Sequence, residues 1–128
     1  MKVLVDTQSI IWFSLNSTQL SQTARLAIED EANECFVSMA TFWEMSIKIN
    51  LGKMDMAGLL LAEFMDKVDE FNFFTLAISR GHVLANGQLP LHHRDPFDRL
   101  IIAQAIFEQM PVVGNDPDFD RYLVQRIW

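Results

Sequence analysis

The stretch LHHRDPFDRLIIAQA, residues 91–105, decides how the rest of the chain is interpreted. Its first nine residues include two histidines, two arginines and two aspartates, and the remainder is almost wholly apolar. Asp95 followed by Pro96 is a strong helix start, with Asp95 as the N-cap and Pro96 as the first helical residue. The pattern therefore predicts a helix that runs to about Glu108.

Asp98 is the unusual residue of this helix. It occupies the third helical position, where the helix dipole favours a negative charge by ~0.3–1 kcal/mol. It also shares a helical face with Ile101, Ile102 and Ala105, because they follow at spacings of three, four and seven residues. That face should pack on a sheet, where an unpaired carboxylate is costly to desolvate. We therefore expect Asp98 to have a partner, and a cation is a good candidate.

Short apolar runs alternate with longer helical patterns around this stretch. The strand candidates are Val3 to Val5, Cys35 to Val37, Phe73 to Leu76 and Pro111 to Val113. The further helix candidates are Ser9 to Leu15, Ser21 to Glu31, Ala40 to a C-cap at Gly52, Leu59 to Glu70, Ser79 to Ala85, and a last turn from Pro117 to Leu123. Strands separated by helices imply crossover connections and a mainly parallel sheet. We predict one α/β domain over residues 1–128, a central sheet flanked by helices.

Composition narrows the class of protein. The chain has 128 residues, half of them hydrophobic, which suits one folded domain and excludes disorder. Its one cysteine, Cys35, suits a reducing compartment, and we expect neither a signal peptide nor a membrane span, because no long apolar run occurs. We expect a soluble cytoplasmic protein. The net charge of −7 argues against broad adhesion to nucleic acid, although bound divalent cations would reverse the local field.

Two further acids follow predicted strands. Asp6 comes directly after the first strand, and Asp116 lies three residues past Val113 in the loop Gly114-Asn115-Asp116-Pro117. Ligands of open α/β sheets gather beyond the carboxyl ends of the strands. Each acid could instead simply start a turn or cap a helix, which is the better interpretation when either is taken singly.

Glu44 stands in the apolar helical sequence Phe42-Trp43-Glu44-Met45. An exposed pair with Lys48, one helical turn later, would explain it at ~0.2–0.5 kcal/mol. Together with Asp6, Asp98 and Asp116, however, it forms a set of acids that suits Mg²⁺ or Mn²⁺. Such a site could activate a water and stabilise the leaving oxygen of a phosphodiester.

These residues resemble a known family. The segments VDTQSIIWF, MATFWEMSIKINLGKM, HHRDPFDRLIIAQA and VVGNDPDF occur in the order found in PIN-domain proteins, and are most similar to VapC-type toxins of bacterial toxin–antitoxin pairs. The resemblance extends from Lys2 to about Tyr122, and RDPFDRLIIAQA is its most specific part.

The resemblance implies a fold and an activity. Family members have a parallel sheet flanked by helices and are typically endoribonucleases that use Mg²⁺ or Mn²⁺ and are inhibited by a cognate antitoxin. The acids carried over by motif are Asp6, Glu44, Asp98 and Asp116, as catalytic and metal-binding residues, with Asp95 mainly as a cap. An RNA substrate, an antitoxin partner and a homodimer are the expected partners, with no membrane association.

One position departs from the family pattern. Family members often carry Thr or Ser where this chain has Gly114, two residues before the last acid. The lost hydroxyl would remove a support of the acidic cluster and leave the loop looser. A catalytically weak PIN domain that binds RNA or protein is therefore the alternative function. A third hypothesis, with Asp6 as an aspartyl nucleophile, ranks lower because Gln8 stands where a second aspartate is expected.

The remaining conspicuous residues have ordinary explanations. His92 and His93 are expected to be a solvated loop pair, and Cys35 a small buried strand residue. Trp12, Phe13, Trp43 and the methionines are expected mostly in the core. Even so, the runs IIWFSL near the N-terminus and MAGLLLAEFM at residues 56–65 are more apolar than one small domain needs. Part of that surface is expected to be an interface with a second copy or with an antitoxin helix.

Overall fold

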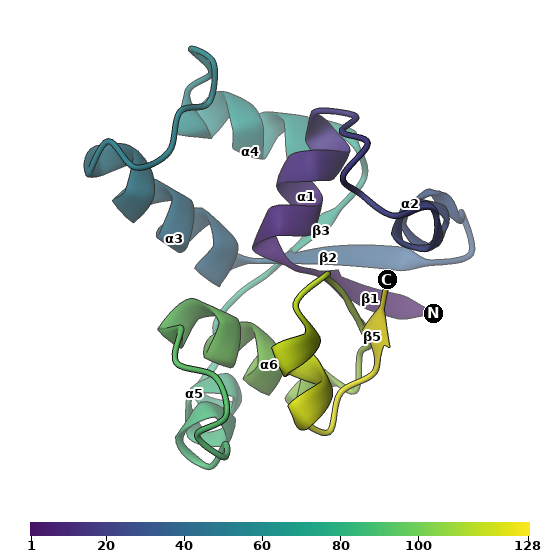
Figure 1. Ribbon diagram of the computed structural model, residues 1–128, viewed down its shortest axis with the longest axis vertical. Coiled ribbons are helices and arrows are strands. Elements are labelled where there is room, and N and C mark those ends of the chain that lie inside the picture. Colours follow the sequence, from purple (N-terminus) through teal and green to yellow (C-terminus); the bar gives the residue numbers. More distant parts are fainter.

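A five-stranded, wholly parallel sheet forms the centre of the molecule. The computed structural model describes all residues 1–128, and the strand order is β3-β2-β1-β4-β5 (Figure 1). The strands are β1 (Lys2–Val5), β2 (Glu34–Ser38), β3 (Phe74–Leu76), β4 (Val112–Val113) and β5 (Arg126–Ile127). The predicted α/β domain with a parallel sheet is therefore confirmed.

Helices cover both faces of this sheet. Figure 1 shows α1, α3 and α4 on one side and α5 and α6 on the other. The helices are α1 (Thr7–Ser14), α2 (Gln22–Glu29), α3 (Met39–Asn50), α4 (Leu61–Glu70), α5 (Arg80–Gly87), α6 (Pro96–Glu108) and the 3₁₀ helix η1 (Pro117–Arg121). The chain thus forms the layered arrangement that parallel strands require, since such strands are joined by crossovers.

The central strand β1 contributes to two separate cores. Val3 and Val5 point to the side of α1, α3 and α4, and belong to a cluster of 14 buried residues. Leu4 points to the other side, where it packs with Ile101 and Ile102 of α6 in a cluster of nine. Successive side chains of a strand face opposite sides of a sheet, so all three consecutive apolar residues are buried, two in one core and one in the other. The helix face predicted to pack on the sheet does so.

Local capping residues fix where the helices begin and end. The Ser21 hydroxyl accepts a hydrogen bond from the Ala24 N–H, and the Asp95 carboxylate accepts from the N–H groups of Phe97 and Asp98. Gly52 follows the end of α3 with φ +68°, a conformation that side chains disfavour. These three caps are among the features that the sequence predicts.

The structure differs from the prediction in one strand and by one or two residues at several element ends. The strand β5 was not predicted; its two residues pair in parallel with β4, through Val112–Arg126 and Val113–Ile127. The helix α4 begins at Leu61 rather than Leu59, because residues 53–60 form a loop before it. Among the helices, none combines the length and the apolar character needed to cross a membrane.

Candidate active site

All four predicted site acids line one cleft at the carboxyl edge of the sheet. The cleft has a volume of about 520 Å³. Asp6 and Asp116 follow β1 and β4, which are neighbouring strands, and the Asp6 N–H donates to the Val113 carbonyl at 3.0 Å. Glu44 comes from α3 and Asp98 from α6. Asp95 and Lys48 also line the cleft.

Asp6 is one of the two buried acids of this cleft, together with Glu44. It caps α1 through a hydrogen bond from the Ser9 N–H to its Oδ1 at 2.9 Å, and its side chain is buried. Burial, together with the smaller effect of the negative charges of Asp116 and Glu44, raises the pKa of Asp6 to about 6. The two possible roles of Asp6, as a cap and as a site acid, are therefore compatible.

Glu44 is buried, whereas its partner is not. Its Oε2 lies 2.8 Å from the Lys48 ammonium, and the two side chains are 7% and 44% exposed. The ion pair with Lys48 that the spacing predicted is therefore present. It is not an exposed pair, however, because the Glu44 side chain is buried. The second oxygen, Oε1, is buried without any hydrogen-bond partner. An unpartnered buried carboxylate oxygen is costly, so it needs a ligand from the cleft.

Asp98 meets the cleft from the first turn of α6. Burial raises the pKa of Asp98 to about 7, and the nearby charges of Asp95, Glu44 and Asp6 also raise it. The backbone N–H of Asp98 donates to Asp95 at 3.1 Å, so Asp95 acts as the predicted cap. Asp95 therefore supports the helix start and adds negative charge beside Asp98.

His93 is part of the site, and its prediction as a solvated loop residue is wrong. Its side chain is 12% exposed, and its Nε2 lies 2.8 Å from Asp116 Oδ2 and 3.3 Å from Asp98 Oδ2. These three residues present ligand-type atoms within 4.8 Å of one another. His92, by contrast, is exposed as expected. No signal in the sequence separates His92 from His93, since they are identical neighbours in one loop.

Gly114 does not leave its loop unsupported. Its N–H donates to the Ile127 carbonyl at 3.2 Å, and its carbonyl accepts from the Arg126 guanidinium at 3.3 Å. A Cβ atom at position 114 would collide with the Asp6 carboxylate. The glycine therefore provides the space that the Asp6 carboxylate occupies. In place of the Thr or Ser side chain of the family pattern, the Asp6 carboxylate itself packs against position 114.

The donor set of the cleft fits a hard divalent cation. Carboxylate oxygens are the ligands that Mg²⁺ and Mn²⁺ prefer, and such ions usually keep bound waters. A cation would satisfy the partnerless oxygen of Glu44 and would stabilise the ionised forms of Asp6 and Asp98, whose pKa values are raised by burial and, less, by like charges. The residues present therefore fit a metal site.

The aromatic residues near the cleft are less buried than predicted. Trp43, expected in the core, is 53% exposed and packs edge-to-face against Phe97 with ring centroids 5.0 Å apart. Trp12 and Phe13 are partly buried and pack against the core of the α1 side. Cys35 is buried as predicted, and burial raises the pKa of its thiol to about 11, so the thiol is not activated.

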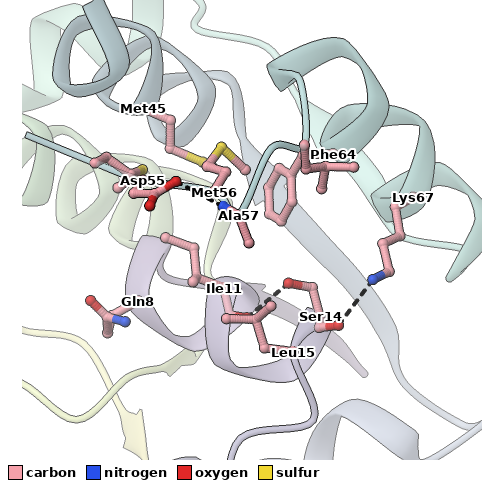
Figure 2. Close-up of a pocket in the computed structure, with 12 residues that line it drawn as sticks. Gln8, Ile11, Ser14, Leu15, Met45, Asp55, Met56, Ala57, Phe64 and Lys67 are labelled. Atoms are coloured by element: carbon pink, nitrogen blue, oxygen red, sulfur yellow. Dashed lines mark hydrogen bonds between the residues drawn. The ribbon is translucent and has the colours of Figure 1, made fainter. Parts of the chain in front are cut away.

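An apolar groove lies beside the cleft. Figure 2 shows Ile11 and Leu15 of α1 facing Met56, Ala57 and Phe64 across it. The groove has a volume of about 200 Å³, and eight of its 12 lining residues are hydrophobic. The two runs that the sequence marked as too apolar therefore lie together. Gln8, Ile11 and Met54 line both the groove and the acidic cleft.

The PIN-domain family model matches residues 3–123, so this chain belongs to the PIN-domain family. No curated protein matches the chain in sequence.

Several solved structures share its fold at low identity. A chain of VapBC2 from Rickettsia felis, solved bound to a promoter DNA fragment, has a TM-score of 0.69 at 16% identity, with all of both chains covered. VapBC-1 from nontypeable Haemophilus influenzae gives 0.64 at 14%, covering 98% of this chain and 96% of that one. FitAcB from Neisseria gonorrhoeae gives 0.62 at 16%, with the same coverage.

The raised pKa of Asp98 predicts how stability responds to pH in the absence of metal. The unfolded chain releases this proton near pH 4, whereas the folded protein holds it up to about pH 7. The contribution of Asp98 to folding is therefore most favourable below pH 4 and is lost as the pH rises to 7. Asp98→Asn should leave the free energy of unfolding nearly unchanged at pH 4.5 and raise it by about 2–3 kcal/mol at pH 7.5.

Urea unfolding in EDTA at several pH values measures this difference. Asp69→Asn, on the exposed side of α4, is the control, because it removes the same charge from an acidic protein at a distance from the cleft. Parallel pH profiles for wild type and Asp98→Asn would contradict the raised pKa.

The space that Asp6 occupies predicts the effect of a side chain at position 114. Gly114→Ala should destabilise the protein by about 1–3 kcal/mol, because the new methyl group forces the Asp6 carboxylate out of its place. Gly87→Ala is the matched control, since nothing lies within 4 Å of the added atom there. Thermal and urea unfolding of both variants provide the comparison, and equal stabilities would show that Asp6 moves without cost.

Proposed function

We propose that this chain is a metal-dependent endoribonuclease, the toxin of a VapC-type toxin–antitoxin pair, which hydrolyses RNA phosphodiester bonds with Mg²⁺ or Mn²⁺. Membership of the PIN-domain family supports a nuclease. The solved structures that share the fold include VapBC and FitAB, which supports a toxin with an antitoxin partner. The single buried cysteine is in keeping with a cytoplasmic location.

The observation that carries the proposal is the partnerless oxygen of Glu44 in a cleft that four more carboxylates line: those of Asp6, Asp95, Asp98 and Asp116. A domain that only binds RNA or protein would have no need to bury a carboxylate oxygen that has no hydrogen-bond donor. Asp6 and Asp98 also share the cleft with their pKa values raised. Perturbed carboxyl groups in a cleft are typical of sites that perform chemistry.

Four acids would hold the cation: Asp6, Glu44, Asp98 and Asp116. When bound, Mg²⁺ or Mn²⁺ supplies a water of lowered pKa and charge stabilisation at the phosphodiester oxygens. Lys48 orients Glu44 through the ion pair, and its half-exposed side chain at the cleft suits an RNA phosphate. Asp95 fixes the start of α6 and therefore the position of Asp98.

RNA cleavage by the purified protein tests this function. A pool of single-stranded and structured RNA is incubated with Mg²⁺, Mn²⁺ or EDTA. We expect cleavage that requires the metal and falls by at least 100-fold in Asp98→Asn, because the loss of a ligand removes charge stabilisation worth several kcal/mol. Asp69→Asn, which changes an exposed acid, should cleave like wild type.

Two outcomes would redirect the proposal. Metal-independent cleavage that survives Asp98→Asn would point to a contaminating nuclease. Uncut RNA from folded protein that also fails to bind Mn²⁺ would favour the alternative, a PIN domain that binds RNA or protein without cleaving. Light scattering of the same samples measures whether the chain is the homodimer that the family resemblance implies.

We further propose that the cognate antitoxin docks in the apolar groove between α1, the loop at residues 54–59 and α4. Apolar side chains from both of its walls face the groove, which suits an amphipathic segment of a partner. Lys67 of α4 lines one end of the groove, and its Nζ donates a hydrogen bond to the Ser14 carbonyl at 3.2 Å (Figure 2). This bond links α4 to α1, the two helices that flank the groove. An antitoxin segment bound in this groove would lie next to the acidic cleft, because the two share lining residues.

Leu15→Asp should weaken inhibition by the antitoxin while leaving RNA cleavage unchanged. Leu15 lines the groove and is exposed, so the variant should fold. Loss of one buried leucine contact, worth about 1.5–3 kcal/mol, corresponds to a 10- to 100-fold rise in the antitoxin concentration needed. Leu26→Asp on α2 is the control, since this exposed leucine does not line the groove. Equal inhibition of both variants would place the antitoxin elsewhere.

A further inference from the structure

His93 engages both of its ring nitrogens. Nδ1 lies 3.1 Å from the backbone N–H of Asp95, which can only donate, so Nδ1 must carry a lone pair. The ring proton is therefore on Nε2. Nε2 lies 2.8 Å from Asp116 Oδ2, to which it donates, and 3.3 Å from Asp98 Oδ2. One N–H thus sits between two carboxylates of the cleft.

The position of this ring is set without help from the acids. The His93 backbone N–H donates to the Tyr122 hydroxyl at 2.7 Å, and that hydroxyl donates to the Pro90 carbonyl at 3.0 Å. The imidazole also packs edge-to-face on Phe119, with ring centroids 6.0 Å apart. Since Phe119 and Tyr122 are both buried, the ring is held by the rigid part of the fold. It can therefore act as a fixed donor to the neighbouring carboxylates.

Resting on the function proposed above, we infer that His93 is a positioning residue of the metal site. Its Nε2–H holds Asp116 beside Asp98, two acids that would otherwise repel each other. Carboxylates that bind metals are usually held by a hydrogen bond from a second residue. In this chain, His93 supplies from the loop before α6 the support that a hydroxyl at position 114 does not provide.

The same geometry argues against His93 as a ligand, although its atoms lie close enough together with those of the two acids. A metal bound at Nε2 would require the ring proton to be on Nδ1. That proton would face the Asp95 N–H, and two donors would oppose each other at 3.1 Å. The carboxylates therefore remain the ligands, and the imidazole acts through them.

Mn²⁺ binding by the full chain, followed by electron paramagnetic resonance without RNA, tests the role of His93. His93→Ala should weaken Mn²⁺ binding by 10- to 100-fold, as is typical when the hydrogen-bond partner of a ligand is removed. His93→Gln should recover most of the affinity, because its amide N–H reaches a similar point. His92→Ala, at the exposed neighbour, should bind like wild type. Pulsed measurements should detect no nitrogen bonded directly to Mn²⁺.

The possible failures are distinguishable. Wild type that does not bind Mn²⁺ would overturn the proposed function and this inference with it. Wild type that binds while His93→Ala binds equally well would overturn only the positioning role. A directly bonded nitrogen that disappears in His93→Ala would make His93 a ligand instead. Thermal unfolding of metal-free His93→Ala identifies a folding defect, and in that event His93→Gln alone decides: unchanged affinity in this variant supports the inference, and lost affinity overturns it.

Discussion

Mutual repulsion between carboxylates at one edge of the sheet is the constraint on which the rest of the site depends. Parallel strands end at the same edge, so β1 and β4 deliver Asp6 and Asp116 as neighbours, and the crossover helices add Glu44 and Asp98. Burial and like charge raise the pKa values of Asp6 and Asp98, to about 6 and about 7. The metal-free fold therefore carries an electrostatic cost that a divalent cation would remove, and metal affinity and folding are linked.

The surrounding residues offset this cost without removing it. Lys48 neutralises one oxygen of Glu44, and backbone N–H groups of Ser9 and Asp118 donate to Asp6 and Asp116 at helix starts. Glu44, Asp6 and Asp116 thus each have a partial compensation that comes from their own segment of the chain. His93 is the exception, since it joins acids that belong to two different segments. None of these donors reaches the second oxygen of Glu44, which leaves the cleft incomplete without a ligand.

The features that could be predicted from the sequence are those fixed by local rules. The caps at Ser21 and Asp95, the apolar strands and the acids after them each depend on a few adjacent residues. The strand β5 could not be recognised, because two residues give no periodic pattern and its pairing depends on β4. His93 required knowledge of a contact across 23 residues, and its neighbour His92 has the same chemistry. Trp43 was misplaced because α3 packs on the core through Phe42 and Met45, which leaves the Trp43 side chain on the exposed side of the helix.

The groove and the cleft are not independent surfaces. Gln8, Ile11 and Met54 line both, so a partner that fills the groove contacts side chains that also form a wall of the cleft. Helix α1 carries this coupling, since its N-cap is the site acid Asp6 and its later turns form the groove. A protein bound along α1 could therefore block the approach of RNA without contacting the acids. Under the proposed function, inhibition by groove binding and catalysis at the acids would both depend on one helix, whose N-cap Asp6 belongs to the cleft and whose apolar side lines the groove.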